Sequence, residues 1–262
     1  MPLKIPAGIS LLFPIILMIV FPFAYLWNVQ LFQTLNCQPS NSEFLNTLML
    51  FTTMTADGFF ILMFFCFWAP ARTQIFISGL IGFLCAAILT QILKSIFDSP
   101  RPPAYFSEVE ICVLGFSFSS RSFPSGHATA AFALARFVFQ SPSNIIRTLA
   151  ILFGIAGSFS RVYTGVHFPA DIVAGAFIGW VVVEICIRLI RVPESKVLSM
   201  LPWISNLAGI SASLAFLFLY EESIPHVEFL TRPLAAVLGL YFFFRLFRQM
   251  YFKKKQTDAP LL

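Results

Sequence analysis

Long uninterrupted runs of apolar residues dominate the chain, and short polar segments separate them. A helix needs about 20 mostly apolar residues to cross the hydrocarbon core of a bilayer. The runs predict eight membrane-spanning helices, at residues 8–29, 44–69, 74–97, 126–140, 147–163, 170–191, 198–220 and 233–249. The spans at 126–140 and 147–163 are short and rich in alanine and glycine, which lets helices approach closely. These two helices are therefore expected in the centre of the bundle.

The composition supports a membrane protein. Of the 262 residues, 58% are hydrophobic and 11% are charged, whereas a soluble domain carries roughly 25% charged residues. The mean hydropathy is +0.84. No repeat or linker divides the chain, so we expect one all-α, polytopic transmembrane bundle over residues 1–262. No A-x-A-like site follows the first apolar run, which is expected to remain as an uncleaved anchor.

The basic residues are distributed unevenly between the predicted loops. With both termini in the cytoplasm, 12 of the 17 Lys and Arg residues, Arg136 among them, fall at or near the cytoplasmic face, as the positive-inside rule requires. The other five are Lys94, Arg101, Arg121, Arg161 and Arg232. The net charge of +5 therefore reflects membrane topology, and no nucleic-acid partner is expected.

Three polar clusters lie on the predicted non-cytoplasmic side. They are "KSIFDSPRPP" with Lys94 and Arg101, "FPSGHA" with Ser125, Gly126 and His127, and "SRVYTGVHFPAD" with Ser160, Arg161, His167 and Asp171. Span 74–97 ends on that side, span 126–140 begins there, and the turn between spans 147–163 and 170–191 lies there. The topology thus brings two histidines, three cations and an aspartate to one membrane face. Ionisable groups at membrane depth are costly and usually functional.

These residue types suit the binding and transfer of a phosphoryl group. Arginine and lysine clamp phosphate oxygens, and Ser125 is suited to cap a helix whose free N–H groups beside Gly126 attract an anion. His167 and Asp171 share a face if their segment is helical, and the carboxylate then leaves one imidazole nitrogen free to attack. His127 comes from another helix and can act as a general acid. The sequence shows no acidic cluster that would predict a metal site.

The spacings K-x6-R-P, P-S-G-H and S-R-x5-H-x3-D resemble the three signature motifs of the type 2 phosphatidic acid phosphatase (PAP2) superfamily. Every signature position matches, in order. The resemblance covers about residues 40–190, and the spans within 198–249 are additional to the six-helix core of that family. It implies an all-helical, metal-independent membrane phosphatase without a cofactor.

The resemblance also implies roles for individual residues. His167 is the expected nucleophile, which forms a phosphohistidine, Asp171 orients it, and His127 protonates the leaving oxygen. The residues expected to hold the phosphoryl oxygens are Lys94, Arg101, Ser125, Gly126 and Arg161. The expected substrate is a polyprenyl diphosphate, phosphatidylglycerophosphate, phosphatidic acid or a lipid A phosphate. In a bacterial inner membrane, the expected location, the site would face the periplasm.

Several alternatives stay open at this point. A lipid phosphotransferase would use the same residues, and a non-catalytic lipid-binding or transport protein could keep the fold, although the intact histidines argue against it. Asp57, in "TTMTADGFF", either breaks the second span at an Asp-Gly turn or forms a polar wall of the pocket. Arg121 is either a headgroup contact or a solvated loop charge. Cys37 and Cys112 fall in loops on the side of the site and can pair if that side is oxidising.

Overall fold

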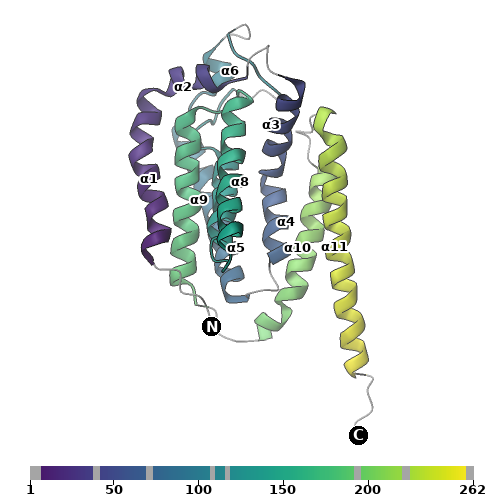
Figure 1. Ribbon diagram of the computed structural model, residues 1–262. Coiled ribbons are helices and arrows are strands. Elements are labelled where there is room, and N and C mark those ends of the chain that lie inside the picture. Colours follow the sequence, from purple (N-terminus) through teal and green to yellow (C-terminus); the bar gives the residue numbers. More distant parts are fainter. Residues whose placement is uncertain are drawn as a thin grey trace.

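A computed structural model of the protein shows an all-helical bundle (Figure 1). It describes residues 7–37, 42–68, 73–106, 110–115, 119–191, 196–219 and 225–257, and these ranges contain no strand. The helices are α1 (Ala7–Leu26), α2 (Asn28–Leu35), α3 (Glu43–Thr55), α4 (Gly58–Trp68), α5 (Thr73–Phe97), α6 (Pro102–Tyr105), α7 (Gly126–Val138), α8 (Asn144–Tyr163), α9 (Pro169–Leu189), α10 (Lys196–Leu219) and α11 (Pro225–Thr257). The fold class agrees with the prediction.

The number of helices that can cross a membrane differs from the predicted eight. Among the described residues, five helices are long and apolar enough alone, and two bent pairs bring the number to seven. The pair α1 and α2 bends by 90°, and the pair α3 and α4 bends by 63°. The predicted span 126–140 corresponds to α7, which has only 13 residues. A helix of this length rises about 20 Å and cannot cross the hydrocarbon core alone.

The predicted span 44–69 is broken in the middle, between α3 and α4. Residues Ala56 and Asp57 separate the two helices. The Asp57 Oδ1 atom accepts the N–H group of Phe59 at 2.8 Å, which satisfies one of the unpaired donors in the first turn of α4. The structure thus confirms that Asp57 lies at a helix break.

Helix α7 lies in the centre of the bundle, as its alanine-rich sequence predicts. Every residue from Ala128 to Val138 is buried, and α7 packs on α5, α8 and α9. Two glycines of α9 allow the closest of these contacts. A Cβ atom at Gly179 would lie 2.2 Å from the Thr129 carbonyl oxygen, and one at Gly175 would lie 2.4 Å from the Ser125 carbonyl oxygen. This packing sets the first turn of α7 against the start of α9.

A buried ion pair joins α7 to α9 in the half of the bundle away from the three polar clusters. Arg136 pairs with Glu184, which also binds Arg188 and accepts the Ser10 hydroxyl. The prediction grouped Arg136 with the basic residues at the cytoplasmic face, but its side chain is buried between helices. Arg136 therefore contributes to helix packing, because a buried cation needs a charged partner.

Helices α10 and α11 pack on each other and on the α4 and α3 flank (Figure 1). Helix α1 begins and α11 ends at the same end of the bundle, whereas α5 ends and α9 begins at the other. Helix α7 also begins there, because Ser125 at its start bonds the Asp171 carbonyl oxygen and Gly126 lies next to Lys94. This up-and-down arrangement brings the three polar clusters to one end, as the predicted topology requires. The boundaries 40–190 for a catalytic core and 198–249 for an addition stay a prediction.

Candidate active site

A pocket of about 320 Å³ lies where the ends of α5, α7 and α8 meet the loop before α9, beside the break between α3 and α4. Its ionisable lining residues are Lys94, Arg101, Arg161, His127, His167 and Asp57. Apolar side chains of α5 and α7, including Phe83, Ala87 and Ala130, line another part of it. The structure thus brings residues from all three polar clusters to one cavity, and Asp57 is part of its polar wall.

His167 and Asp171 form a buried pair. The distance from His167 Nδ1 to Asp171 Oδ2 is 3.2 Å, and both side chains are almost inaccessible. The expectation of one helical face is wrong in detail, because His167 lies in the loop before α9 and only Asp171 is helical. Asp171 Oδ2 also accepts the N–H group of Phe168 at 2.9 Å. The carboxylate therefore caps α9 and holds the histidine at once.

Ser122 also contacts both members of this pair, although its role is not predicted by the sequence motifs. Its hydroxyl donates to Asp171 Oδ2 at 2.5 Å and lies 3.4 Å from His167 Nδ1. The side chain is fully buried. The Ser122 N–H group donates to the Ser99 carbonyl oxygen at 2.9 Å, so the same residue anchors the loop that follows α5. Its place just before "FPSGH" was the one signal in the sequence that pointed to it.

Neutral oxygen atoms orient the three cations of the pocket. Lys94 Nζ donates to the Arg121 carbonyl oxygen at 2.6 Å, and Arg101 Nε donates to the Ser120 carbonyl oxygen at 2.9 Å. Arg161 donates to the Thr53 hydroxyl at 2.9 Å. Arg121 itself has an exposed side chain and a positive φ of 56°, so the contact that places it in the site is made by its backbone.

The start of α7 faces the pocket through Gly126. A Cβ atom on Gly126 would have no neighbour closer than 4.0 Å, the distance to the Lys94 Cε atom. Ser125 caps the helix, as predicted, because its hydroxyl oxygen accepts the Ala128 N–H group at 3.5 Å. Ser125 does not line the pocket, and its own N–H group donates to the Asp171 carbonyl oxygen at 3.0 Å. The Ser160 hydroxyl donates to Gly157 within α8 and does not line the pocket either.

The surroundings of His167 favour its neutral form. Burial lowers the pKa of His167 well below its ordinary value of 6.5, and the positive charges of Arg101 and Arg161 lower it further. A neutral imidazole that donates its Nδ1 proton to Asp171 keeps a lone pair on Nε2. His167 is therefore arranged to present a basic nitrogen near the three cations.

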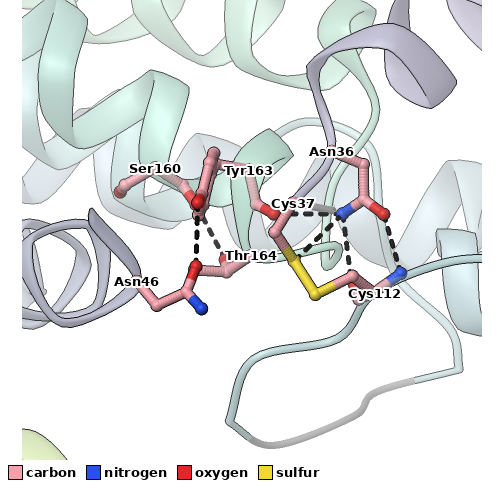
Figure 2. Close-up of a disulfide and its surroundings, with 7 residues drawn as sticks. All are labelled: Asn36, Cys37, Asn46, Cys112, Ser160, Tyr163 and Thr164. Carbon is pink, nitrogen blue, oxygen red and sulfur yellow. Dashed lines mark hydrogen bonds between the residues drawn. A yellow bond between two sulfur atoms is a disulfide. The ribbon is translucent and has the colours of Figure 1, made fainter. Parts of the chain in front are cut away.

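A disulfide joins the loop after α2 to the loop between α6 and α7 (Figure 2). It links Cys37 and Cys112, whose Cα atoms are 5.4 Å apart, and so supports the expected pairing. Asn36 reinforces the link, because its side chain bonds both the N–H and the carbonyl of Cys112 at 2.8 Å. The Asn36 amide also donates to the Tyr163 carbonyl oxygen at 3.0 Å. Both loops are thereby fastened to the end of α8, two residues after Arg161.

The fold and the pocket together define a polytopic helical membrane protein with a cation-lined site that holds two histidines. The comparison with protein families agrees with this class. Residues 75–193 match the PAP2 superfamily, and this part of the chain is a PAP2-superfamily domain. The match confirms the resemblance found in the sequence motifs. Its range includes every residue that is expected to bind the phosphate or to take part in its transfer.

Known proteins with lipid substrates resemble this chain. It is 23% identical over 159 residues to the undecaprenyl-diphosphatase BcrC of Bacillus subtilis, covering 59% of this chain and 80% of that protein. It is 31% identical over 127 residues to a lipid A 4'-phosphatase of Porphyromonas gingivalis, covering 46% of this chain and 54% of that protein. The crystal structure of Aquifex aeolicus LpxE superposes with a TM-score of 0.57 at 25% identity, covering 62% of this chain and 94% of that chain.

Proposed function

We propose that the protein hydrolyses a lipid phosphate or diphosphate through a phosphohistidine at His167. One observation carries this proposal: His167, held by the buried Asp171, lines the same pocket as three cations and a second histidine. The cations attract a phosphoryl group, and the pair supplies a nucleophile directed at it. The PAP2 domain and the phosphatases among the relatives support the same reaction.

The residues support a reaction in two steps. In the first, His167 Nε2 attacks phosphorus, the bond from phosphorus to the leaving oxygen breaks, and His127 gives that oxygen a proton. In the second, water attacks phosphorus, the bond from phosphorus to His167 Nε2 breaks, the water proton passes to His127, and inorganic phosphate leaves. Asp171 stabilises the imidazolium character that His167 gains on attack.

The charge that develops on the phosphoryl oxygens is met by side chains and by one helix end. The residues proposed to bind it are Lys94, Arg101, Arg161, Gly126 and Ser125. Gly126 leaves the first turn of α7 open to the pocket, and Ser125 acts by capping that turn. Because fixed cations and N–H groups can neutralise this charge, we propose that the reaction needs no metal ion.

The apolar part of the pocket suits a lipid substrate. Phe83, Ala87 and Ala130 line the cavity together with the polar groups, so a lipid can leave its chains among the helices while its phosphate meets the cations. The relatives act, by their names, on an undecaprenyl diphosphate and on lipid A. We propose a substrate of this class, an amphiphile with a terminal phosphate or diphosphate.

The disulfide supports the proposed orientation of the site. Disulfides persist in oxidising compartments and are rare in the cytosol, and Cys37–Cys112 lies at the same end of the bundle as the pocket. We therefore propose that this end faces the periplasm of a bacterial inner membrane and that both termini are cytoplasmic. Quantitative alkylation of both thiols in unreduced membranes would contradict this orientation.

The test measures phosphate release by purified protein in detergent across a panel of lipid phosphates and diphosphates. The His167→Ala variant should release none, whereas the matched variant His226→Ala, outside the PAP2 domain, should keep full activity. Trapping of radiolabelled phosphate on the wild type but not on His167→Ala would support the covalent intermediate. Vanadate should inhibit, since it mimics the five-coordinate transition state, and EDTA should not.

Three outcomes would contradict the proposal in different ways. Full activity of His167→Ala would remove the nucleophile. Strong inhibition by EDTA would reject metal independence. Phosphate transfer that occurs only after an acceptor lipid is added would identify a phosphotransferase.

A further inference from the structure

A carboxylate from outside the PAP2 domain faces the second histidine of the pocket. Asp57 lies at the break between α3 and α4, and residues 75–193 do not include it. The distance from Asp57 Oδ2 to His127 Nε2 is 3.9 Å, and each side chain is 15% exposed. Both residues line the pocket. The two side chains therefore come from distant parts of the chain and meet at the proposed phosphate site.

Asp57 is oriented by its own helix. Its Oδ1 atom accepts the Phe59 N–H group at 2.8 Å, and its main-chain carbonyl accepts the Ile61 N–H group at 2.9 Å. With Oδ1 held by the first turn of α4, Oδ2 is the oxygen that faces His127. The break in the second span thus delivers a fixed carboxylate to the pocket.

A carboxylate partner favours the protonated form of His127, which its surroundings otherwise oppose. Its Nε2 atom is buried and forms no hydrogen bond within the described part of the chain. Three cations share the pocket with it, and their charges oppose a positive imidazole. The other carboxylate nearby, Asp171, already accepts bonds from Ser122 and Phe168 and faces His167.

We propose that Asp57 and His127 form a second His–Asp pair, in which Asp57 is the positioning residue for the general acid. The inference rests on the proposed function. Asp57 accepts the Nε2–H bond and stabilises the imidazolium, so that Nδ1 faces the leaving group. As the bond from phosphorus to oxygen breaks, the Nδ1 proton moves to the leaving oxygen and the imidazole becomes neutral. The present 3.9 Å is about 1 Å longer than a hydrogen bond, and such contacts tighten when substrate binds.

The two pairs would be arranged in a complementary way. In the first pair, His167 donates its Nδ1 proton to Asp171, and its Nε2 lone pair attacks phosphorus. In the second pair, His127 donates its Nε2 proton to Asp57, and its Nδ1 proton is available to the leaving oxygen. A leaving group that is already a stable anion needs no proton, so the contribution of Asp57 should depend on the leaving group. A carboxylate that only caps α4 would not show this dependence.

The experiment compares Asp57→Asn with wild type on two substrates in detergent. Asparagine caps a helix as well as aspartate does, so this variant removes the charge and keeps the turn. Phosphatidic acid has an alkoxide leaving group, and p-nitrophenyl phosphate has a stable phenolate. The measured quantity is kcat/KM, which covers the steps up to departure of the leaving group. Asp98→Asn is the matched control, because Asp98 is exposed and does not line the pocket.

We expect kcat/KM of Asp57→Asn to fall about 10- to 100-fold for phosphatidic acid and less than about 3-fold for p-nitrophenyl phosphate, within the range of general acid catalysis. Asp57→Glu should recover part of the loss, and Asp98→Asn should match wild type. Equal losses on both substrates, or no loss on either, would overturn the inference.

Vanadate binding by calorimetry gives a second readout that does not need turnover. An apical vanadate oxygen stands in for the leaving oxygen, so Asp57→Asn should bind vanadate about 10-fold more weakly than wild type and Asp98→Asn equally well. A wild type that binds vanadate but releases no phosphate would reject the proposed function alone, and the comparison of variants would still decide the role of Asp57. Unchanged vanadate binding by Asp57→Asn, or no binding by the wild type, would overturn the second pair.

Discussion

Replacement of Ser122 by alanine tests whether the His167–Asp171 pair depends on a third residue. The substitution removes the hydroxyl that donates to Asp171 Oδ2 at 2.5 Å and leaves that oxygen with the Phe168 N–H group and His167. A hydrogen bond to a charged group contributes about 1.5–3 kcal/mol, and about 1.4 kcal/mol corresponds to a tenfold change in rate. If this energy holds Asp171 in place during attack, kcat/KM should fall about 10- to 150-fold.

The assay is phosphate release at several substrate concentrations, together with the thermal unfolding midpoint of each variant. Ser120→Ala is the matched control, since Ser120 lies in the same loop and is exposed. Ser122→Cys keeps nearly the same shape but donates more weakly, so its activity should lie between those of wild type and Ser122→Ala. Folded Ser122→Ala protein with activity within about twofold of wild type would refute the reasoning.

Three further predictions concern the site and its support. Because the pKa of His167 lies well below 6.5, lowering the pH from 7.5 to about 6.5 should leave the nucleophile neutral, and the acid limb of kcat/KM should be centred below pH 6.5; a limb centred at or above that value would contradict the assignment. Glu184→Gln should lower stability by about 3–5 kcal/mol, since it leaves Arg136 buried without its charged partner, and a leucine pair at both positions should restore most of the unfolding temperature. Gly179→Ala should lower the unfolding temperature, because its Cβ would lie 2.2 Å from the Thr129 carbonyl oxygen; an unchanged midpoint would show that α7 and α9 can separate at no cost.

Much of the architecture follows from local pattern. Apolar runs of sufficient length predict membrane helices, and alanine and glycine in the segment 126–140 predict a central helix. Helix α7 is central and almost entirely buried. The convergence of three polar clusters at one end of the bundle follows from alternating helix direction alone, since each helix reverses the course of the chain. Fixed spacings within "FPSGHA" and "SRVYTGVHFPAD" point to the histidines because each spacing is local.

The errors occur where distant segments decide the outcome. The Asp-Gly step at Asp57 allows a break in the span 44–69, but the sequence does not show the 63° bend between α3 and α4, which depends on how each half packs on the rest of the bundle. Arg136 looks like an interfacial cation until Glu184 is seen beside it in space. Ser122 has no charge and no signature spacing, and only the folded loop brings its hydroxyl to Asp171.

The sequence by itself determined the class of protein, the identity of the histidines, and the end of the bundle at which they gather. These properties depend on composition and on spacings of a few residues, and local chemistry decides both. Only the tertiary structure decided that Ser122 contacts Asp171, that Asp57 lines the pocket and faces His127, and that Cys37 lies within bonding distance of Cys112. These contacts join residues 49 to 75 positions apart, and the packing of whole helices, which no local pattern encodes, brings them together.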